Sequence, residues 1–344
     1  MIYDAWNLEY EEHKEEYLEV FDRCMSTNNI EKIEFPKFNR KYGVPVASAT
    51  DALQFSLMCH DIGPGDEVLV SDFSWISSAS CISMVGATPV FCDINLETYT
   101  LSLDSIQRMT SDKTKALVYT HLFGNISDDV VDILNWCKEN NIIFIEDAAQ
   151  SLGAYKNDII AGTLGDCSSF SFNSNKVIAG INGGGVFLTD NKEDAKHVEK
   201  CSRHGRGEFL GRNSKAYLLN TEIIKLRLKY ADEYMKRRQE IAKKYDNSLE
   251  DVITQKFHEG HNYHKYVIRV EDKLIRDNIV NQTKAQIHYP LILSNNKCFG
   301  YAKKDDIVNA QIASETVVSL PIHPWLTDEE IYNISNMVNI SLCS

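Results

Sequence analysis

A single lysine, Lys176, stands where an ordinary surface lysine is poorly explained. It follows an apolar, strand-like run that ends in small polar residues, and a glycine cluster at residues 180–185 comes after it. A buried lysine has a lowered pKa and can form an imine with a carbonyl group. The glycines lack the spacing of a dinucleotide-binding loop or a P-loop, but they would let the backbone pass close to a bound group. From this stretch alone, a lysine on a loop surface remains an alternative.

A carboxylate, Asp147, directly follows the apolar run at residues 142–146. That run is predicted to be a buried strand, so Asp147 would lie at its carboxyl end, where open α/β sheets bind their ligands. Asp147 could therefore face a ligand. It could equally cap a following helix.

Two further features follow predicted strands or begin predicted helices. Ser48, Ala49 and Thr50 begin a helix that runs through Leu57, and the free N–H groups at such an end suit a phosphate. An ordinary N-cap would explain the same residues. Trp75 follows the predicted strand at 68–70, and its aromatic face could stack on a flat ring, although a core tryptophan fits the same pattern.

Taken together, these features are more specific than any one of them. A phosphate cradle, a flat aromatic ring, a carboxylate and a lysine all fall at the carboxyl ends of one predicted sheet. They are the parts needed to hold pyridoxal 5′-phosphate (PLP), with Lys176 as the imine-forming amine. Asp147 would keep the pyridine nitrogen protonated, so that the ring could act as an electron sink.

The elements that must position these residues alternate along the chain. Continuous apolar strands separated by amphipathic helices predict a largely parallel sheet covered on both faces. The predicted strands are 68–70, 89–92, 116–119, 142–146, 168–172 and 186–189, and the predicted helices are 74–84, 103–109, 128–140 and 191–203.

Outside this pattern, residues 7–25 predict one amphipathic helix and residues 217–248 one long charged helix. Strands at 266–270 and 286–289 and helices at 307–318 and 328–338 are predicted to follow. We therefore expect an α/β protein with an N-terminal segment and large domain at 1–216, a linking helix at 217–250, and a smaller C-terminal α/β domain at 251–344.

Composition narrows the class of protein. The net charge is −13 and there is no basic run, so nucleic acid and anionic lipid are not expected partners. Nine cysteines without a CxxC pair predict reduced thiols and no metal site. The N-terminal residues have no signal-peptide pattern, and no apolar run is long enough to span a membrane. These observations predict a cytoplasmic protein.

Several motifs in order resemble the DegT/DnrJ/EryC1/StrS sugar aminotransferases. The early ones are residues 49–53 (Ala-Thr-Asp-Ala-Leu), 63–68, 73–75, 86–91, 121–124, 146–150 (Glu-Asp-Ala-Ala-Gln) and 170–176. The late ones are 204–205, 212–214, 238–245, 288–290 and 319–324. The resemblance covers nearly the whole chain. It implies a PLP enzyme of fold type I, which is the aspartate aminotransferase-like fold.

The resemblance also implies roles for individual residues. Lys176 would be the Schiff-base lysine and the proton shuttle between Cα of the amino donor and C4′ of the cofactor. Asp147 would pair with the pyridinium nitrogen, Gln150 would bond the phenolic oxygen, and Trp75 would stack on the ring. The remaining implied contacts to the cofactor are from Ala49, Thr50, Ser171 and Asn173, and from Asn213 of the neighbouring subunit of a homodimer. His288 and Tyr289 would lie near the sugar or nucleotide.

This chain departs from the family pattern in places. It is shorter, with a trimmed segment before Ala47. Residues 181–184 read Ile-Asn-Gly-Gly where the family usually has Gly-Glu/Asp-Gly-Gly, and residues 220–222 read Asn-Thr-Glu in place of a Gln-Ala-Ala type helix start. These changes leave the substrate open, and Asn173 and the loop at 181–182 are the expected carriers of substrate choice.

The expected reaction is a ping-pong transamination. L-glutamate would convert PLP to pyridoxamine 5′-phosphate, which would aminate a nucleotide-linked keto sugar for a surface polysaccharide or another glycoconjugate. Since position 176 is lysine and not the histidine of related 3-dehydrases, transamination is favoured over dehydration. The Ser-Phe-Asn-x-Asn-Lys form resembles members that aminate C4 of 4-keto-6-deoxyhexoses.

Other readings remain. A 3-keto sugar, or a long-chain sugar acid, could be the substrate. The chain could also be a non-catalytic regulator that binds PLP or a nucleotide sugar, or a PLP enzyme that catalyses oxidation or elimination. The retained Lys176 and Asp147 argue against the regulator.

Overall fold

The structure is a computed structural model that describes residues 2–26, 35–36, 38–256 and 258–343. Its centre is an eight-stranded sheet with the strand order β1-β9-β8-β5-β4-β2-β3-β12. The strands are β1 (Tyr42–Val46), β2 (Glu67–Ser71), β3 (Thr88–Cys92), β4 (Thr114–Thr120), β5 (Ile143–Asp147), β8 (Cys167–Ser171), β9 (Gly185–Thr189) and β12 (Lys303–Lys304). Strands β8, β5, β4, β2, β3 and β12 pair in parallel, and β9 is antiparallel to both β1 and β8.

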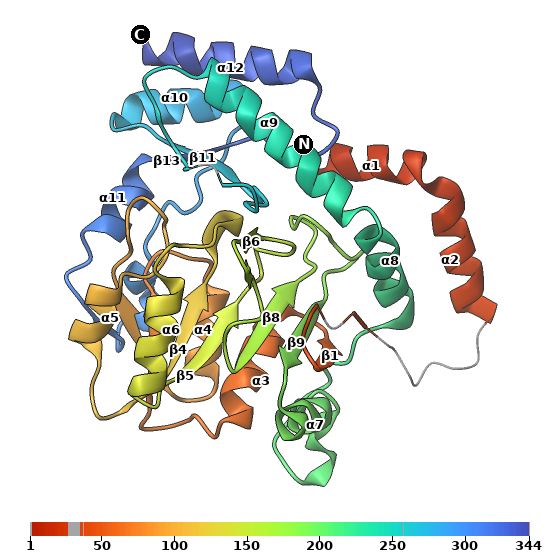
Figure 1. Ribbon diagram of the computed structural model, residues 1–344, viewed down its shortest axis with the longest axis vertical. Coiled ribbons are helices and arrows are strands. Elements are labelled where there is room, and N and C mark those ends of the chain that lie inside the picture. Colours follow the sequence, from red (N-terminus) through yellow and green to blue (C-terminus); the bar gives the residue numbers. More distant parts are fainter. Residues whose placement is uncertain (1, 27–34, 37, 257, 344) are drawn as a thin grey trace.

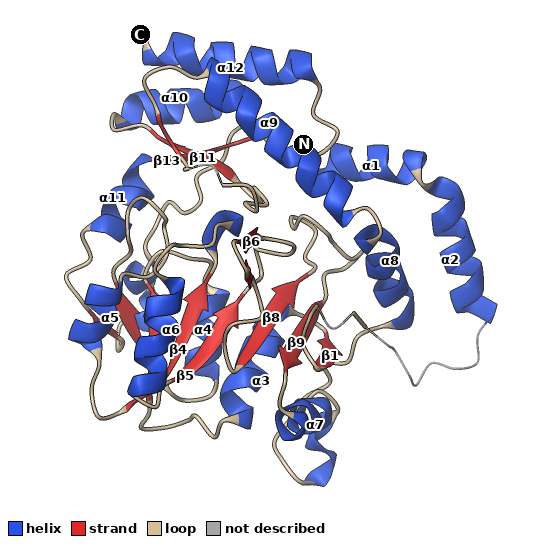
Figure 2. Ribbon diagram, in the orientation of Figure 1, coloured by secondary structure: helices blue, strands red, loops and turns tan. Residues whose placement is uncertain are grey.

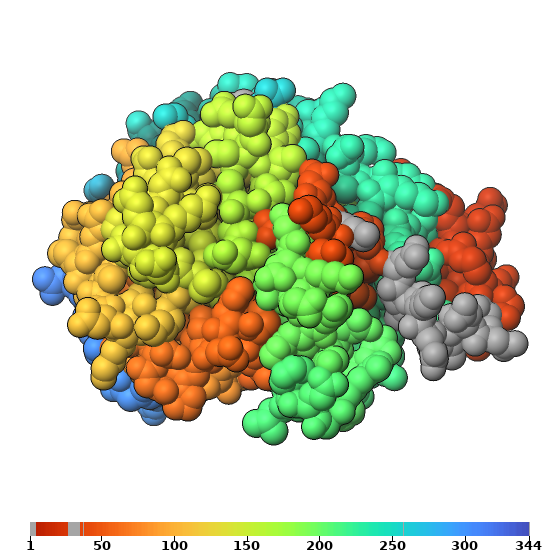
Figure 3. Space-filling model, turned by 60° about the horizontal axis from the view of Figure 1, so that its bottom comes forward, coloured from red at the N-terminus to blue at the C-terminus, as the bar shows by residue number. Residues whose placement is uncertain are grey.

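Helices cover both faces of this sheet, as the alternating pattern predicts. Because successive side chains of a strand point to opposite faces, Val68 and Val70 enter one core cluster and Leu69 enters another. The first cluster packs against α3 (Ala49–Cys59), α4 (Ser77–Met84) and α7 (Lys192–Cys201). The second packs against α5 (Leu103–Met109) and α6 (Val130–Glu139). Figure 3 views the molecule from below and shows the segments of α3 (orange) and α7 (green) side by side.

A second, three-stranded antiparallel sheet lies above the first (Figure 2). Its order is β10 (Ile253–Thr254), β11 (Tyr266–Arg269) and β13 (Val317–Leu320). Its core is shared with α9 (Ala231–Ser248), α10 (Lys273–Thr283) and α12 (Asp328–Leu342). The arrows of β4 and β8 in Figure 2 point toward this upper sheet, so the carboxyl ends of the central strands face it. The division into domains at 1–216, 217–250 and 251–344 stays a prediction.

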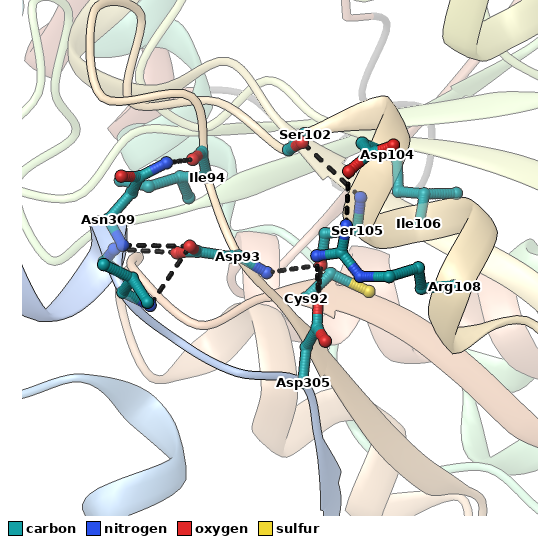
Figure 4. A network of polar contacts seen from close by, with 12 residues as sticks. Cys92, Asp93, Ile94, Ser102, Asp104, Ser105, Ile106, Arg108, Asp305 and Asn309 are labelled. Carbon is teal, nitrogen blue, oxygen red and sulfur yellow. Dashed lines mark hydrogen bonds and ion pairs between the residues drawn. The ribbon is translucent and has the colours of Figure 1, made fainter.

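A polar network fastens the C-terminal part to the large sheet (Figure 4). Asp93, just after β3, accepts hydrogen bonds from the backbone N–H groups of Val308, Asn309 and Ala310 at 2.8–3.1 Å. These groups lie at the start of α11 (Asn309–Thr316), so the carboxylate satisfies its free donors. Asp305 lies directly after β12, and its carboxylate accepts a hydrogen bond of 2.6 Å from Ser105 Oγ. The network therefore holds a segment of the C-terminal part, residues 305–310, against the edge of the large sheet.

Four predicted elements differ in the structure. The helix expected at 217–248 is two helices, α8 (Leu218–Leu228) and α9, because the chain turns at residues 229–230. The helix expected at 7–25 is likewise two, α1 (Ile2–Glu12) and α2 (Lys14–Ser26). Residues 317–318, expected at the end of a helix, begin β13. The strand expected at 286–289 is only an isolated bridge between Gln286 and Ser319, and the His288–Tyr289 peptide is cis.

The remaining elements are short. They are β6 (Tyr155–Lys156), β7 (Ile159–Ile160), η1 (Leu122–Gly124), η2 (His204–Gly207), η3 (Leu293–Asn295) and η4 (Lys297–Phe299). Figure 1 shows α1 and α2 in red beside α8 and α9. Residues 27–34, in the predicted trimmed segment, lie outside the described residues. Within the described part of the chain, no helix is both long and apolar enough to cross a bilayer.

Candidate active site

The predicted site residues converge on one cavity of about 380 Å³, a size that suits a small ligand. It lies at the carboxyl ends of the central strands. All of the predicted residues except Asn213 line it, namely Ala49, Thr50, Trp75, Asp147, Gln150, Ser171, Asn173, Lys176, His288 and Tyr289. Asn213 is exposed, and its backbone pairs with Arg203 in an isolated bridge. The structure thus brings together residues that are up to 240 positions apart, from 49 to 289.

Asp147 ends β5 between its neighbours Thr120 on β4 and Ser169 on β8. It is buried, and its Oδ2 accepts a hydrogen bond of 2.7 Å from Ser78 Oγ. Its Oδ1 accepts one of 3.2 Å from the backbone N–H of Ala149. No helix follows, because residues 149–150 form a turn. The capping alternative is therefore wrong, and a held carboxylate faces the cavity.

Lys176 is half-buried in the cavity wall, just beyond β8. Its backbone N–H closes a turn on the carbonyl oxygen of Asn173 at 2.9 Å. Burial lowers the pKa of Lys176 to about 8, and the nearby Asp147 carboxylate opposes part of that shift. The ammonium can therefore release its proton near neutral pH. Lys176 is not the lysine of an exposed loop, and it can serve as a nucleophilic amine.

The glycines after Lys176 fall into two groups, those that lie against protein backbone and those that line the cavity. A Cβ on Gly180 would lie 2.2 Å from Gly183 O, and one on Gly185 would lie 2.3 Å from the backbone of Ser48. These two glycines permit close passage of protein backbone. Gly183 and Gly184 line the cavity itself. The side chain of Asn220 ties the loop down, since its Nδ2 donates to Gly183 O and its Oδ1 accepts from Ile181 N, both at 2.7 Å.

The N-termini of two helices meet at one side of the cavity. Ser48 is the N-cap of α3, accepting a hydrogen bond of 3.1 Å from the backbone N–H of Asp51. Thr50 Oγ1 donates to Ser77 Oγ at 2.9 Å, and Ser77 begins α4. Ser48, Thr50 and Ser77 all line the cavity. Ser48 is thus an ordinary N-cap, and the paired helix ends also suit a phosphate.

Aromatic and amide groups form another part of the wall. Trp75 is 57% exposed, so it is not a core tryptophan, and its ring centroid lies 6.1 Å from that of Tyr289. Gln150 Nε2 donates to Tyr289 Oη at 3.0 Å, while its Oε1 accepts from the backbone N–H of Phe123 at 2.9 Å. These two bonds fix the orientation of the amide. Burial, with the nearby Lys265 and Lys176, lowers the pKa of His288 to about 3, so this imidazole is neutral.

Sequence reasoning missed several residues of this site. Ser77, His264 and Lys265 line the cavity, and Ser78 holds Asp147 from behind. Lys265 is only 9% exposed, and burial, with Arg238 and Lys176 nearby, lowers its pKa to about 7. The signal that could have found Lys265 is its place directly beside the apolar strand predicted at 266–270.

The donor set fits PLP. The cavity offers a carboxylate, an amine of lowered pKa, an exposed indole and two helix N-termini with hydroxyl groups. The family model described as the DegT/DnrJ/EryC1/StrS aminotransferase family matches residues 25–339. The chain belongs to this family. It is accordingly a PLP-dependent aminotransferase of the α/β fold-type-I class.

Curated relatives and solved structures agree with this assignment. The dTDP-3-amino-3,6-dideoxy-alpha-D-galactopyranose transaminase of Aneurinibacillus thermoaerophilus is 33% identical, with 87% of this chain and 85% of that protein covered. The UDP-2-acetamido-2-deoxy-3-oxo-D-glucuronate aminotransferase of Pseudomonas aeruginosa is 31% identical, with 85% and 84% covered. A DegT DnrJ EryC1 StrS aminotransferase from Brucella abortus shares the fold at a TM-score of 0.90 and 22% identity, with 97% of each chain covered.

Proposed function

We propose that this aminotransferase moves an amino group from L-glutamate to a keto sugar carried on a nucleotide. The proposal rests on one observation above all. A buried carboxylate, Asp147, and a half-buried lysine of lowered pKa, Lys176, face the same cavity at the carboxyl ends of the central strands. The relatives named above support the sugar substrate, because both are transaminases of nucleotide-linked sugars by name.

The cofactor would be held by residues of α3, α4, β5 and β8 and of the loops beside them. Ala49, Thr50 and Ser171 would bind the phosphate, and Ser77 adds a hydroxyl beside Thr50. Trp75 would stack on the ring, and Asn173 would complete the contacts. Asp147 would keep a proton on the pyridine nitrogen, and Gln150 would bond the phenolic oxygen through the amide that Phe123 and Tyr289 orient.

When bound, PLP supplies an electrophilic carbonyl carbon and an electron sink for amino-group exchange. The side chains of the protein would transfer the protons and hold the reacting groups in place. Lys176 Nζ would accept the proton that leaves Cα of the amino donor and would later return a proton to the sugar carbon. A pKa of about 8 suits this task, since the amine then takes up and releases protons near neutral pH. Ser78 would keep Asp147 in place through the exchange.

We propose that C4 of a 4-keto-6-deoxyhexose receives the amine. The dTDP-4-dehydro-2,3,6-trideoxy-D-glucose 4-aminotransferase of Saccharopolyspora spinosa, 27% identical, supports this choice by its name. A specific observation also favours a second candidate, amination at C3. The two relatives from Aneurinibacillus thermoaerophilus and Pseudomonas aeruginosa, which are more similar in sequence, carry names that refer to C3. A long-chain sugar acid stays a further alternative.

The working form proposed here is a cytoplasmic homodimer with shared sites. Asn213 is exposed in its own subunit, so its side chain is free to extend to the cofactor phosphate of a neighbouring subunit. His288 and Tyr289 would contact the sugar or the nucleotide. The product would feed a surface polysaccharide or another glycoconjugate. The spore coat polysaccharide biosynthesis protein SpsC of Bacillus subtilis, 30% identical, supports such a role.

The test is to load the protein with pyridoxamine 5′-phosphate and present a panel of dTDP-, UDP- and GDP-linked keto sugars. Mass spectrometry and NMR of the product would identify the carbon that is aminated. We expect a C4-aminated 6-deoxyhexose and, when L-glutamate is then added to regenerate pyridoxamine 5′-phosphate, one equivalent of 2-oxoglutarate for each glutamate consumed. Release of ammonia, or uptake of oxygen, in place of 2-oxoglutarate would favour an eliminating or oxidising enzyme. A protein that takes up no PLP would contradict the proposal.

A further inference from the structure

Lys265 is a buried amine whose protonated form has no counter-charge within hydrogen-bond or ion-pair distance in the described chain. It lies directly before β11, is 9% exposed, and lines both the main cavity and an adjoining smaller one. Among the described residues, none forms an ion pair or a hydrogen bond with its ammonium. Removing an ammonium from water without a partner is unfavourable. A residue that breaks this rule beside an active site is a candidate for binding a ligand.

The charges around Lys265 have one sign. Lys176 and Arg238 line the smaller cavity with it, and His264 and His288 are held neutral because burial and these cations lower their pKa values. Among the described residues that line the two cavities, Asp147 is the only carboxylate. It already accepts hydrogen bonds from Ser78 and Ala149. The shared wall of the cavities is therefore a region of positive potential that favours an anion.

The backbone directly before Lys265 is held in place by hydrogen bonds. Asn262 Nδ2 donates to Gln150 O and Leu152 O, both at 3.0 Å, and Arg238 Nη1 donates to Tyr263 O at 3.0 Å. A Cβ on Gly124 would lie 1.6 Å from Asn262 Oδ1, so the loop sits directly against that glycine. The backbone that carries Lys265 therefore needs little further ordering when a ligand binds.

The cofactor does not account for this cation. Its phosphate is assigned to the helix ends at Ser48–Thr50 and Ser77, and its ring nitrogen to Asp147. Lys265 comes from the opposite side, directly before a strand of the upper sheet. Resting on the proposed function, we infer that Lys265 binds a carboxylate group of a substrate, with Arg238 adding positive potential behind it. The carboxylate can belong to the amino donor or to a sugar acid.

The test uses the PLP-loaded protein and measures equilibrium binding by calorimetry. The dicarboxylate glutarate stands for the amino donor. UDP-glucuronate and UDP-glucose stand for the sugar, since they differ only at C6, which is a carboxylate in the first and a hydroxymethyl group in the second. We expect Lys265→Met to weaken the binding of glutarate or of UDP-glucuronate at least tenfold, and to leave UDP-glucose within about twofold. If the binding of glutarate weakens, the carboxylate belongs to the amino donor, and if that of UDP-glucuronate weakens, it belongs to the sugar. Lys265→Arg, which keeps the charge, should restore most of the affinity.

Lys273→Met is the matched control, because Lys273 is an exposed lysine on α10 of the same C-terminal part. Unchanged binding of both carboxylate probes by Lys265→Met overturns the inference. So does an equal loss for UDP-glucose, because the lysine would then serve the diphosphate. So does a loss of the visible absorbance of bound PLP in Lys265→Met that Lys265→Arg restores, because the lysine would then serve the cofactor. If the wild-type protein does not bind PLP, the proposed function itself fails, which is a separate outcome.

Discussion

Ser78 Oγ lies 2.7 Å from Asp147 Oδ2 and donates a hydrogen bond to it, so a hydroxyl group on α4 holds the buried carboxylate at the end of β5. Ser78 is itself fully buried, and its Oγ lies 3.0 Å from Ser74 Oγ. Residues that touch nothing in the cavity thus determine where the carboxylate points. Such support is what keeps a charged group of an active site in a productive orientation.

We predict that Ser78→Ala weakens the binding of PLP about ten- to a hundredfold. A hydrogen bond to a charged group contributes ~1.5–3 kcal/mol, and about 1.4 kcal/mol corresponds to a factor of ten. Absorbance titration of the cofactor-free protein with PLP measures the change. Ser80→Ala on the same helix is the control, because no hydrogen bond of its side chain is seen in the described structure. Equal affinities of the two variants would contradict the role of Ser78.

Trp75 should affect cofactor affinity without affecting stability. Its side chain is 57% exposed at the cavity, so little apolar area is lost from the core when it is removed. Trp75→Ala is expected to weaken PLP binding several-fold, whereas Trp75→Phe keeps a ring and should bind nearly as well as the wild type. Thermal unfolding of the cofactor-free proteins should be alike. A large fall in melting temperature would show that Trp75 has a role in the core.

The two cavity lysines make stability depend on pH. Folding lowers the pKa of Lys176 from 10.5 to about 8, and that of Lys265 from 10.5 to about 7. Between these values the unfolded chain binds more protons, so the free energy of unfolding contributed by these groups rises as the pH rises through that window. Below about pH 7 the full cost of burying both charges applies. At about 1.4 kcal/mol per pKa unit, these shifts correspond to an effect on the order of 3–5 kcal/mol for each lysine.

The prediction is therefore that Lys265→Met is relatively more stable than the wild type at about pH 7, and loses this advantage by about pH 10. Urea unfolding of the cofactor-free proteins across this range measures it, and Lys273→Met should follow the wild type throughout. Burial raises the pKa values of several cysteines and tyrosines, which contributes a pH dependence of the opposite sign, so only the difference between variants is informative. A constant difference between Lys265→Met and the wild type would rule out the proposed titration.

Asp93 should be important for stability because its carboxylate accepts three backbone hydrogen bonds at the start of α11 (Figure 4). Asp93→Ala would leave these donors without their partner, and we expect the free energy of unfolding to fall by ~2–4 kcal/mol. Asp104→Ala is the control. Its ion pair with Arg108 is exposed, and exposed pairs contribute ~0–1 kcal/mol. Similar losses in both variants would contradict this account.

The sequence predicts most of the central sheet because β2, β3, β4, β5 and β9 contain apolar runs between turn residues, whereas β12 (Lys303–Lys304) has no such run and is not predicted. Asp147 and Lys176 could be identified because both follow such runs, and strand ends meet at one edge of a parallel sheet. The linking helix could not be predicted correctly. Its charged, periodic pattern continues through Lys229 and Tyr230, and only packing of α8 against α2 and of α9 against α12 separates the two helices.

Site residues whose partners lie far away in the sequence were harder to predict. Ser78 reads as one serine among several at residues 77–80, and its importance depends on a partner 69 positions away. Lys265 stands out only because Arg238 and Lys176, from other parts of the sequence, lie near it and help to lower its pKa. The segment at 286–289 is predicted as a strand, yet its backbone pairs with β13 only at the bridge between Gln286 and Ser319. His288 and Tyr289, beyond that bridge, line the cavity.

The most direct test of the central claim is the first half-reaction with the amino donor. L-glutamate is added to the purified, PLP-loaded protein without any sugar, and the visible spectrum and the release of 2-oxoglutarate are followed together. We predict that the yellow colour is lost as one equivalent of 2-oxoglutarate per site appears, and that Lys176→Ala shows no turnover. A wild-type protein that stays yellow and releases no 2-oxoglutarate would contradict the account.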